Sequence, residues 1–186
     1  QKPSEAFIVD LSNGNYTLIE KKVVIEGQKT AYFSEKFLEI TVPVTTKEQI
    51  KEIKKTVTHI AKKHDEEPYK ALATTQQAIF HQLEEQDEID AAAIFDKVFE
   101  EKPLAREAAQ LAITEERVPE KIAVTNVPKY ERKYSKQKFK LDNGIEITIP
   151  SEIYENKEMV EFINNPDGSV SVLIKNIESI LNKFNA

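Results

Sequence analysis

Two glycine-containing turns in the last third of the chain constrain the fold most, because they set the pairing of four strands. A two-residue turn at Asn143-Gly144 would place Ile147 opposite Lys140. A three-residue loop that also includes the preceding aspartate instead pairs Phe139 with Ile147. Only this choice brings apolar side chains together on one face. The sequence therefore predicts a type I turn that is closed by Gly144 in a left-handed bulge.

The second turn has the sequence Asn-Pro-Asp-Gly at 165–168. Proline suits the second position of such a turn, and glycine suits the left-handed one. A three-residue loop then pairs Phe162 with Val172 and Val160 with Ile174. The last third is therefore predicted to hold two antiparallel hairpins, with a short helical turn between them at 150–154 and a terminal helix over 177–183.

The opening of the chain favours antiparallel strands. Turn signals at Asn13-Gly14 and Glu26-Gly27 separate runs of β-prone residues. These runs cover 6–11, 16–19, 23–25 and 30–33. The simplest arrangement is a meander of three strands.

The middle of the chain has helical periodicity. Thr45 and Glu48 have the spacing of a capping box, and Pro68 and Pro103 suit the first turns of helices. Four helices are predicted, over about 45–60, 68–83, 89–99 and 103–113. The fold class is therefore α+β, with N-terminal antiparallel strands, a central helical segment of about four helices, and C-terminal hairpins with a terminal helix.

The 186 residues suit one generous domain or two small ones. We expect strands and helices over 1–128, and a basic linker, two β-hairpins and a helix over 129–186. The two parts can also form one continuous domain. Gln1 is not an initiator methionine, and an apolar strand pattern begins soon after it, so we expect a fragment of a longer protein.

Composition excludes several kinds of chemistry. The chain has no cysteine, which rules out disulfides, thiolate zinc sites and a cysteine nucleophile. His59 and His64 lie on different sides of one predicted helix, and His81 lies on the next, so no metal site is expected. All four glycines are assigned to turns, and no phosphate loop or nucleophile elbow is present. We therefore expect no catalytic residues, no cofactor and no enzymatic activity.

Charge is unevenly distributed along the chain. The net charge is −6, yet residues 129–140 carry six positive charges and one negative. Residues 84–101 carry eight acids against one lysine. The acidic run is most simply a solvated helix face, and its alternative is a docking surface for a basic partner. No apolar run approaches the ~20 residues of a membrane span, so we expect a cytoplasmic protein without membrane contact.

The segment 129–140 is the candidate nucleic-acid site. Its lysine and arginine side chains can neutralise phosphates, and its exposed aromatic rings can stack on unpaired nucleobases. The alternative is a linker that enters an edge strand with a lysine-rich outer face, in which Phe139 belongs to the core. The candidate binding residues are Lys129, Tyr130, Arg132, Lys133, Tyr134, Lys136, Lys138 and Lys140.

Three stretches resemble the bacterial nucleoid-associated protein family of the NdpA/YejK type. They are 160–168 with 172–177; Lys138 to Ile145, ending at Pro150; and the opening, with Tyr16 to Lys21, Tyr32-Phe33-Ser34 and Phe37-Leu38. Val118 to Lys121 also fits. The resemblance covers essentially the whole chain, as the C-terminal portion of a longer family member.

The resemblance implies a cytoplasmic, nucleoid-localised protein that binds or organises DNA. It carries over no catalytic residues. Because the net charge is negative, the main DNA contacts are expected in the missing N-terminal portion or through another protein. The alternative function is a protein-interaction or oligomerisation module, which recruits a nucleoid partner or a second copy.

Overall fold

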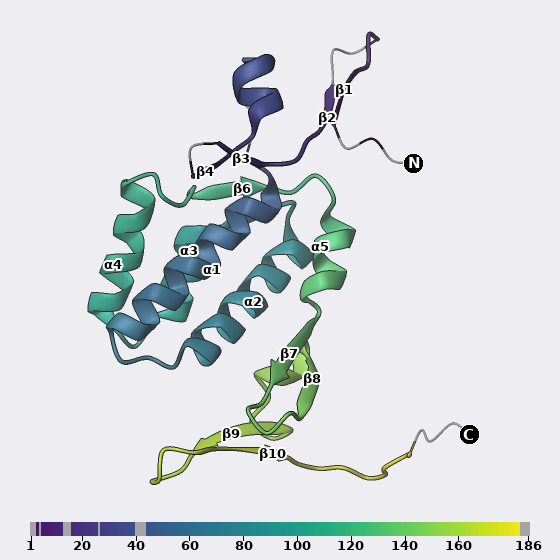
Figure 1. Ribbon diagram of the computed structural model, residues 1–186. Coiled ribbons are helices and arrows are strands. Elements are labelled where there is room, and N and C mark those ends of the chain that lie inside the picture. Colours follow the sequence, from purple (N-terminus) through teal and green to yellow (C-terminus); the bar gives the residue numbers. More distant parts are fainter. Residues whose placement is uncertain (1–2, 4, 13–15, 26, 40–43, 183–186) are drawn as a thin grey trace. The chain divides into compact units, whose positions relative to one another are not determined.

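The computed structural model describes residues 3, 5–12, 16–25, 27–39 and 44–182. It divides into two compact units, residues 1–45 and 46–186, and each is described by itself below (Figure 1). The mixed architecture confirms the predicted α+β class, with N-terminal strands, central helices and C-terminal hairpins. A domain boundary at residue 128 stays a prediction.

The first unit contains two separate antiparallel hairpins. Strand β1 (Ala6–Val9) pairs with β2 (Tyr16–Ile19), and β3 (Val23–Ile25) pairs with β4 (Gln28–Thr30). The predicted antiparallel strands are confirmed, but the meander is wrong, because the two pairs form two sheets. Gly27 has φ +81°, as its turn requires. The predicted turn at Asn13-Gly14 lies outside the described residues.

The last β-prone run, 30–33, is a strand only at Thr30, and a π-helical turn, η1 (Phe33–Phe37), begins at its end. The Glu20 carboxylate accepts hydrogen bonds from the main-chain N (3.0 Å) and the hydroxyl (2.6 Å) of Ser34. Ser34 is fully buried. The carboxylate therefore ties the start of η1 to the residue that follows β2.

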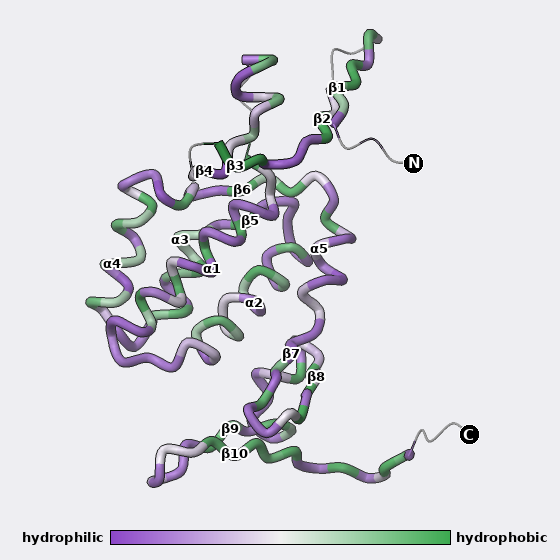
Figure 2. Tube along the Cα trace, in the orientation of Figure 1, coloured by the Kyte–Doolittle hydropathy of each residue, from purple (hydrophilic) through white to green (hydrophobic). Residues whose placement is uncertain are grey.

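Four helices in the second unit confirm the predicted helical segment. They are α1 (Thr46–Lys63), α2 (Pro68–Glu85), α3 (Ala91–Val98) and α4 (Pro103–Thr114). Proline occupies the first turn of α2 and of α4. The N–H groups of a first turn have no intrahelical acceptor, so no hydrogen bond is lost when proline, which lacks an N–H, stands there. In Figure 2 hydrophobic and hydrophilic segments alternate along these helices, as amphipathic packing requires. The buried stripe of α1 is the predicted one: Ile50, Ile53, Val57 and Ile60.

A short two-stranded sheet between the helices was not predicted. Strand β5 (Glu88–Asp90) pairs antiparallel with β6 (Lys121–Ala123), and Ile89 faces Ile122 in the core. The third helix therefore begins at Ala91, after the predicted start at residue 89. Asp90 ends the strand and caps the helix, because its carboxylate accepts a 2.9 Å hydrogen bond from the Ala93 N–H.

The C-terminal hairpins have the predicted registers. Strands β7 (Lys136–Lys140) and β8 (Glu146–Pro150) pair Phe139 with Ile147, and β9 (Val160–Asn164) and β10 (Val170–Ile174) pair Phe162 with Val172. The predicted turn at 150–154 is helix α6 (Ser151–Tyr154).

Both hairpin loops close as predicted. The Gly144 N–H donates to the Leu141 carbonyl (3.1 Å), and the Leu141 N–H donates to the Ile145 carbonyl (2.8 Å). This is a type I turn with a bulge, and the glycine has φ +88°. Gly168 has the same role in the second loop, with φ +84°.

The predicted terminal helix is wrong, since residues 175–182 contain no helix. The Lys175 N–H donates to the Met159 carbonyl (2.8 Å), which continues strand-like pairing past β10. Asn176 then has φ +55°, and its amide donates to the Glu158 carbonyl (3.0 Å). These contacts tie residues 175 and 176 to the chain just before β9, and the left-handed Asn176 interrupts any right-handed helix before residue 177.

Candidate nucleic-acid interface and the adjoining groove

The first half of the candidate segment is a helix, which corrects the prediction of a linker. Helix α5 (Val127–Tyr134) begins after Asn126, whose side-chain oxygen accepts a hydrogen bond from the Lys129 N–H (3.2 Å). Val127, Tyr130 and Tyr134 lie at helical spacing and pack against the helical core. The asparagine cap, the proline that follows it and this apolar spacing were sequence signals for a helix.

The three bases of α5 point away from that core. Lys129, Arg132 and Lys133 are all exposed. Arg132 and Lys133 follow Lys129 by three and four residues, so the three side chains occupy one face of the helix. In Figure 2 this helix is mostly hydrophilic.

Strand β7 continues the basic segment with a different period. Lys136, Lys138 and Lys140 are exposed, while Gln137 is buried and Phe139 is half-buried. Alternation places the three lysines on one face of the strand and turns Gln137 and Phe139 to the other. The expected lysine-rich outer face of an edge strand is therefore present.

None of the six basic side chains of α5 and β7 forms an ion pair within the part of the chain that the structure describes. Other bases do, as in Lys97 with Glu155 (2.9 Å) and Lys121 with Glu88 (2.8 Å). These six basic side chains form what we call the α5–β7 basic surface: Lys129, Arg132, Lys133, Lys136, Lys138 and Lys140. Their charge is not neutralised internally and is available to an anionic partner.

The two candidate stacking residues differ in access. Tyr134 is 7% exposed and belongs to the core, which leaves its ring faces unavailable to a nucleobase. Burial, with a smaller effect of Tyr130, raises the pKa of Tyr134 to about 12. Tyr130 is half-buried, and the amines of Lys129 and Lys133 lie 5.5 and 5.8 Å from its ring centre. The tyrosines therefore anchor the helix and support its bases.

The histidines and the acidic run show no assembled site. Within the described ranges, no group of three His, Asp or Glu side chains is placed to hold a metal ion. Members of the run 84–101 are divided among the end of α2, β5, α3 and the turn after it. Two of them, Glu88 and Asp96, form ion pairs with basic side chains.

No helix within the described ranges combines the length and apolar character needed to cross a membrane.

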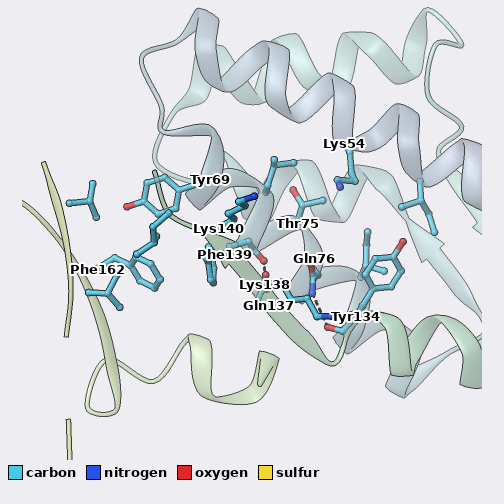
Figure 3. Close-up of a pocket in the computed structure, with 17 residues that line it drawn as sticks. Lys54, Tyr69, Thr75, Gln76, Tyr134, Gln137, Lys138, Phe139, Lys140 and Phe162 are labelled. Atoms are coloured by element: carbon cyan, nitrogen blue, oxygen red, sulfur yellow. Dashed lines mark hydrogen bonds between the residues drawn. The ribbon is translucent and has the colours of Figure 1, made fainter. Parts of the chain in front are cut away.

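A groove of about 460 Å³ adjoins the basic surface, and sequence reasoning did not find it. Figure 3 shows side chains from α1, α2, β7 and the last hairpin around it. Its apolar lining includes Leu72, Ile79 and Phe162, and its charged lining consists of Lys54, Lys138 and Lys140. No local pattern could have indicated it, because its walls come from residues as far apart in the chain as Ile50 and Val172.

Two glutamines fasten the strand side of the groove to α2. The Gln76 amide donates to the carbonyls of Tyr134 (3.2 Å) and Lys136 (2.8 Å). Buried Gln137 donates in the other direction, to the Ala73 carbonyl (2.8 Å). The half-buried Gln76 amide and the buried Gln137 amide thus satisfy main-chain oxygens across this contact, so β7 is held at a defined position beside the helix.

Comparison with known proteins bears on the whole chain. A family model described as nucleoid-associated protein YejK matches residues 1–182. The match includes both compact units and all of the α5–β7 basic surface. No curated protein and no solved structure gives a significant match.

Proposed function

This chain belongs to the family of nucleoid-associated protein YejK, and from that premise we propose that its α5–β7 basic surface binds the phosphate backbone of DNA. The observation that carries the proposal is a set of six lysine and arginine side chains, exposed along one helix and the strand that follows it, with no ion-pair partner among the described residues. Clustered lysine and arginine side chains displace counterions from DNA when they contact its phosphates, and this release drives association.

The proposed contact is independent of DNA sequence and involves no catalysis. Lysine and arginine side chains that meet phosphates position a protein on DNA but do not read bases. The aromatic groups of the segment are packed inward or covered by lysines, so little of the surface is left for stacking. We place the protein at the nucleoid on the same grounds.

The net charge of −6 limits how DNA can approach. The rest of the chain carries the excess of acid and repels a polyanion, so we propose that DNA approaches this chain mainly at the basic surface. We therefore propose a small footprint with an affinity that is weak at physiological salt. Further DNA contacts outside this surface, or a bridging protein, remain part of the proposal.

The test is a salt titration of binding to a 30-base-pair duplex of mixed sequence. Charge reversal of Arg132→Glu with Lys133→Glu should weaken binding and lower the slope of log Kd against log salt by about 2, one phosphate contact for each residue. The matched control is Lys62→Glu with Lys63→Glu, because both pairs are adjacent, exposed and in the last turn of a helix.

Two results would overturn the proposal. One is a lack of duplex binding by this chain at low salt. The other is an equal loss of binding in the control and test variants, which would indicate an effect of net charge alone.

A second candidate function is self-association or recruitment of another nucleoid protein. It is favoured by exposed apolar side chains after the last strand, where Ile180 and Leu181 are 86% and 80% exposed. Sedimentation of the chain at increasing concentration tests self-association. The wild type should gain mass, and Ile180→Ser with Leu181→Ser should not; a strictly monomeric wild type counts against it.

A further inference from the structure

The outer edge of β7 has main-chain groups that its hairpin does not use. In an antiparallel pair, residues alternate between those bonded to the partner strand and those whose N–H and C=O point away. The bond from the Leu141 N–H to Ile145 puts odd-numbered residues of β7 on the bonded side. A bond from Ser151 N–H to the Ser135 carbonyl (2.8 Å) agrees with this register. The even-numbered residues therefore face the other edge.

That edge faces the groove. The carbonyl of Lys136, the first even-numbered residue, accepts a hydrogen bond from Gln76, which lines the groove on the α2 side. Beyond it, the main-chain groups of Lys138 and Lys140 point the same way. In the described part of the chain, no hydrogen bond to the N–H or C=O of either residue is found across this edge. The strand is bound to α2 at its start and open after it.

The walls of the groove have a mixed chemistry. Its volume, about 460 Å³, is in the range of ligand sites, and most of its lining is apolar or aromatic. Three lysines, Lys54, Lys138 and Lys140, are among its lining residues, and no aspartate or glutamate is. None of the three is in an ion pair within the described ranges, and the charged residues that line the groove are all lysines, which favours an occupant that brings carboxylates.

We propose that this groove binds an extended peptide segment of a partner protein, in which acidic and apolar residues alternate, as an added strand on the open edge of β7. Its main chain pairs with Lys138 and Lys140, as strand addition requires. Its apolar side chains enter the groove toward Leu72, Ile79 and Phe162, and its carboxylates meet the lysine amines. The proposal concerns a protein partner and does not depend on the DNA contact proposed above.

Two other occupants fit the groove less well. A nucleic acid offers phosphates to the lysines, but it has no peptide main chain to pair with a strand edge. A second copy could offer its own residues 175–182, but Glu178 is the only acid there and Lys175 offsets its charge. Both occupants are arms of the test.

The first experiment measures binding of a fluorescein-labelled seven-residue peptide of alternating glutamate and valine, blocked at both ends. Lys138→Pro removes one N–H of the open edge without breaking a bond to β8, and we expect about tenfold weaker binding. Lys138→Ala keeps the N–H and should lose less. The matched control is Thr148→Pro, which removes an N–H from the opposite, outer edge of the same hairpin and should bind normally.

The second experiment does not depend on the variants folding. N-methylation of alternate peptide nitrogens should abolish binding when it removes the donors that face β7, and backbone amide resonances of Lys138 and Lys140 should shift only with the unmethylated peptide. Equal binding of all methylated forms would overturn the proposal. So would undiminished binding to a folded Lys138→Pro.

Competition separates the other occupants. Arg132→Glu with Lys133→Glu should leave peptide binding unchanged, even where it abolishes duplex binding. If a peptide of residues 175–182 displaces the probe at lower concentration than the unlabelled probe itself, the occupant is a second copy and the proposal is wrong. Displacement by single-stranded DNA with no amide shift at Lys138 would refute it as well.

Discussion

The side-chain amide of Gln137 donates a 2.8 Å hydrogen bond to the main-chain carbonyl of Ala73, and both residues are buried. The contact joins a strand whose other face consists of lysines to the middle of helix α2. A second contact lies beside it, where the Ser151 hydroxyl donates to the Tyr134 carbonyl (2.5 Å). These polar groups hold the basic surface and the groove edge at fixed positions on the helical core.

Substitution of Gln137 should separate packing from hydrogen bonding. Gln137→Leu keeps the volume and loses the donor, so the free energy of unfolding should fall by about 1 kcal/mol in urea denaturation at pH 7. Gln137→Glu should cost more at this pH, because an ionised carboxylate would be buried against a carbonyl oxygen.

The pH dependence of Gln137→Glu gives this prediction a sign. Burial raises the pKa of the introduced carboxyl in the folded state above its unfolded value, so the variant should gain stability relative to wild type as pH falls from 7 toward 4. A protonated carboxyl can then donate to Ala73. A stability difference that stays constant over this range would show that residue 137 is not buried against the carbonyl.

The hairpin glycines should be costly to replace for conformational reasons alone. A Cβ at Gly144 or Gly168 would meet no atom within 4 Å, but both residues have φ near +85°. Replacement by alanine should cost about 1–2 kcal/mol at each position, and the two costs should add because the loops are separate. Gly144→Asn should cost less, since asparagine tolerates this conformation better. Unchanged denaturation midpoints would contradict the bulged-turn geometry.

Tyr134 should make the protein sensitive to alkaline pH. Its pKa is raised to about 12 by burial, whereas an unfolded tyrosine ionises near pH 10. Between these values the unfolded state binds fewer protons than the folded state, so stability falls as pH rises, by at most about 1.4 kcal/mol per pH unit from this residue.

Tyr134→Phe should remove that contribution. The variant and wild type should have similar stability at pH 8 and diverge above pH 10, with the variant losing less. Thermal unfolding followed by circular dichroism at several pH values measures the two slopes. Parallel slopes would mean that the hydroxyl of residue 134 is in water.

The cap of α5 should control the order of the basic surface. Asn126→Ala removes the side-chain acceptor for the Lys129 N–H, which should cost about 1 kcal/mol and speed hydrogen exchange in the first turn of the helix. Asn126→Asp keeps an acceptor and should preserve protection. If Asn126→Ala leaves exchange at Lys129 unchanged, the cap does not stabilise the helix.

Local patterns were enough to predict the elements whose partners are close in sequence. The register of both C-terminal hairpins followed from side-chain alternation and loop length, because a shift of one residue would have separated Phe139 from Ile147. The starts of α2 and α4 followed from prolines that fit only the first turn of a helix. The basic residues were identified from charge alone, and their exposure agrees with it.

The tertiary structure decided what depends on distant partners. Ile89 is in a strand and not a helix, because Ile122 pairs with it from 33 residues away. Residues 177–182 have helical periodicity but no helix, since the Lys175 N–H and the Asn176 side chain are bonded to the carbonyls of Met159 and Glu158, and Asn176 is left-handed. The segment 127–134 is a helix with its tyrosines against α2, so Tyr134 is an anchor and not a stacking surface.

The sequence by itself thus determined a basic segment and the hairpin that it enters. Only the tertiary structure decided that one edge of that hairpin is open and faces an apolar groove beside α2. The physical reason is that strand register is set by neighbours along the chain, whereas an open edge depends on which groups of other elements reach it. Here Gln76 reaches Lys136, and among the described residues no group reaches the main chain of Lys138 across that edge.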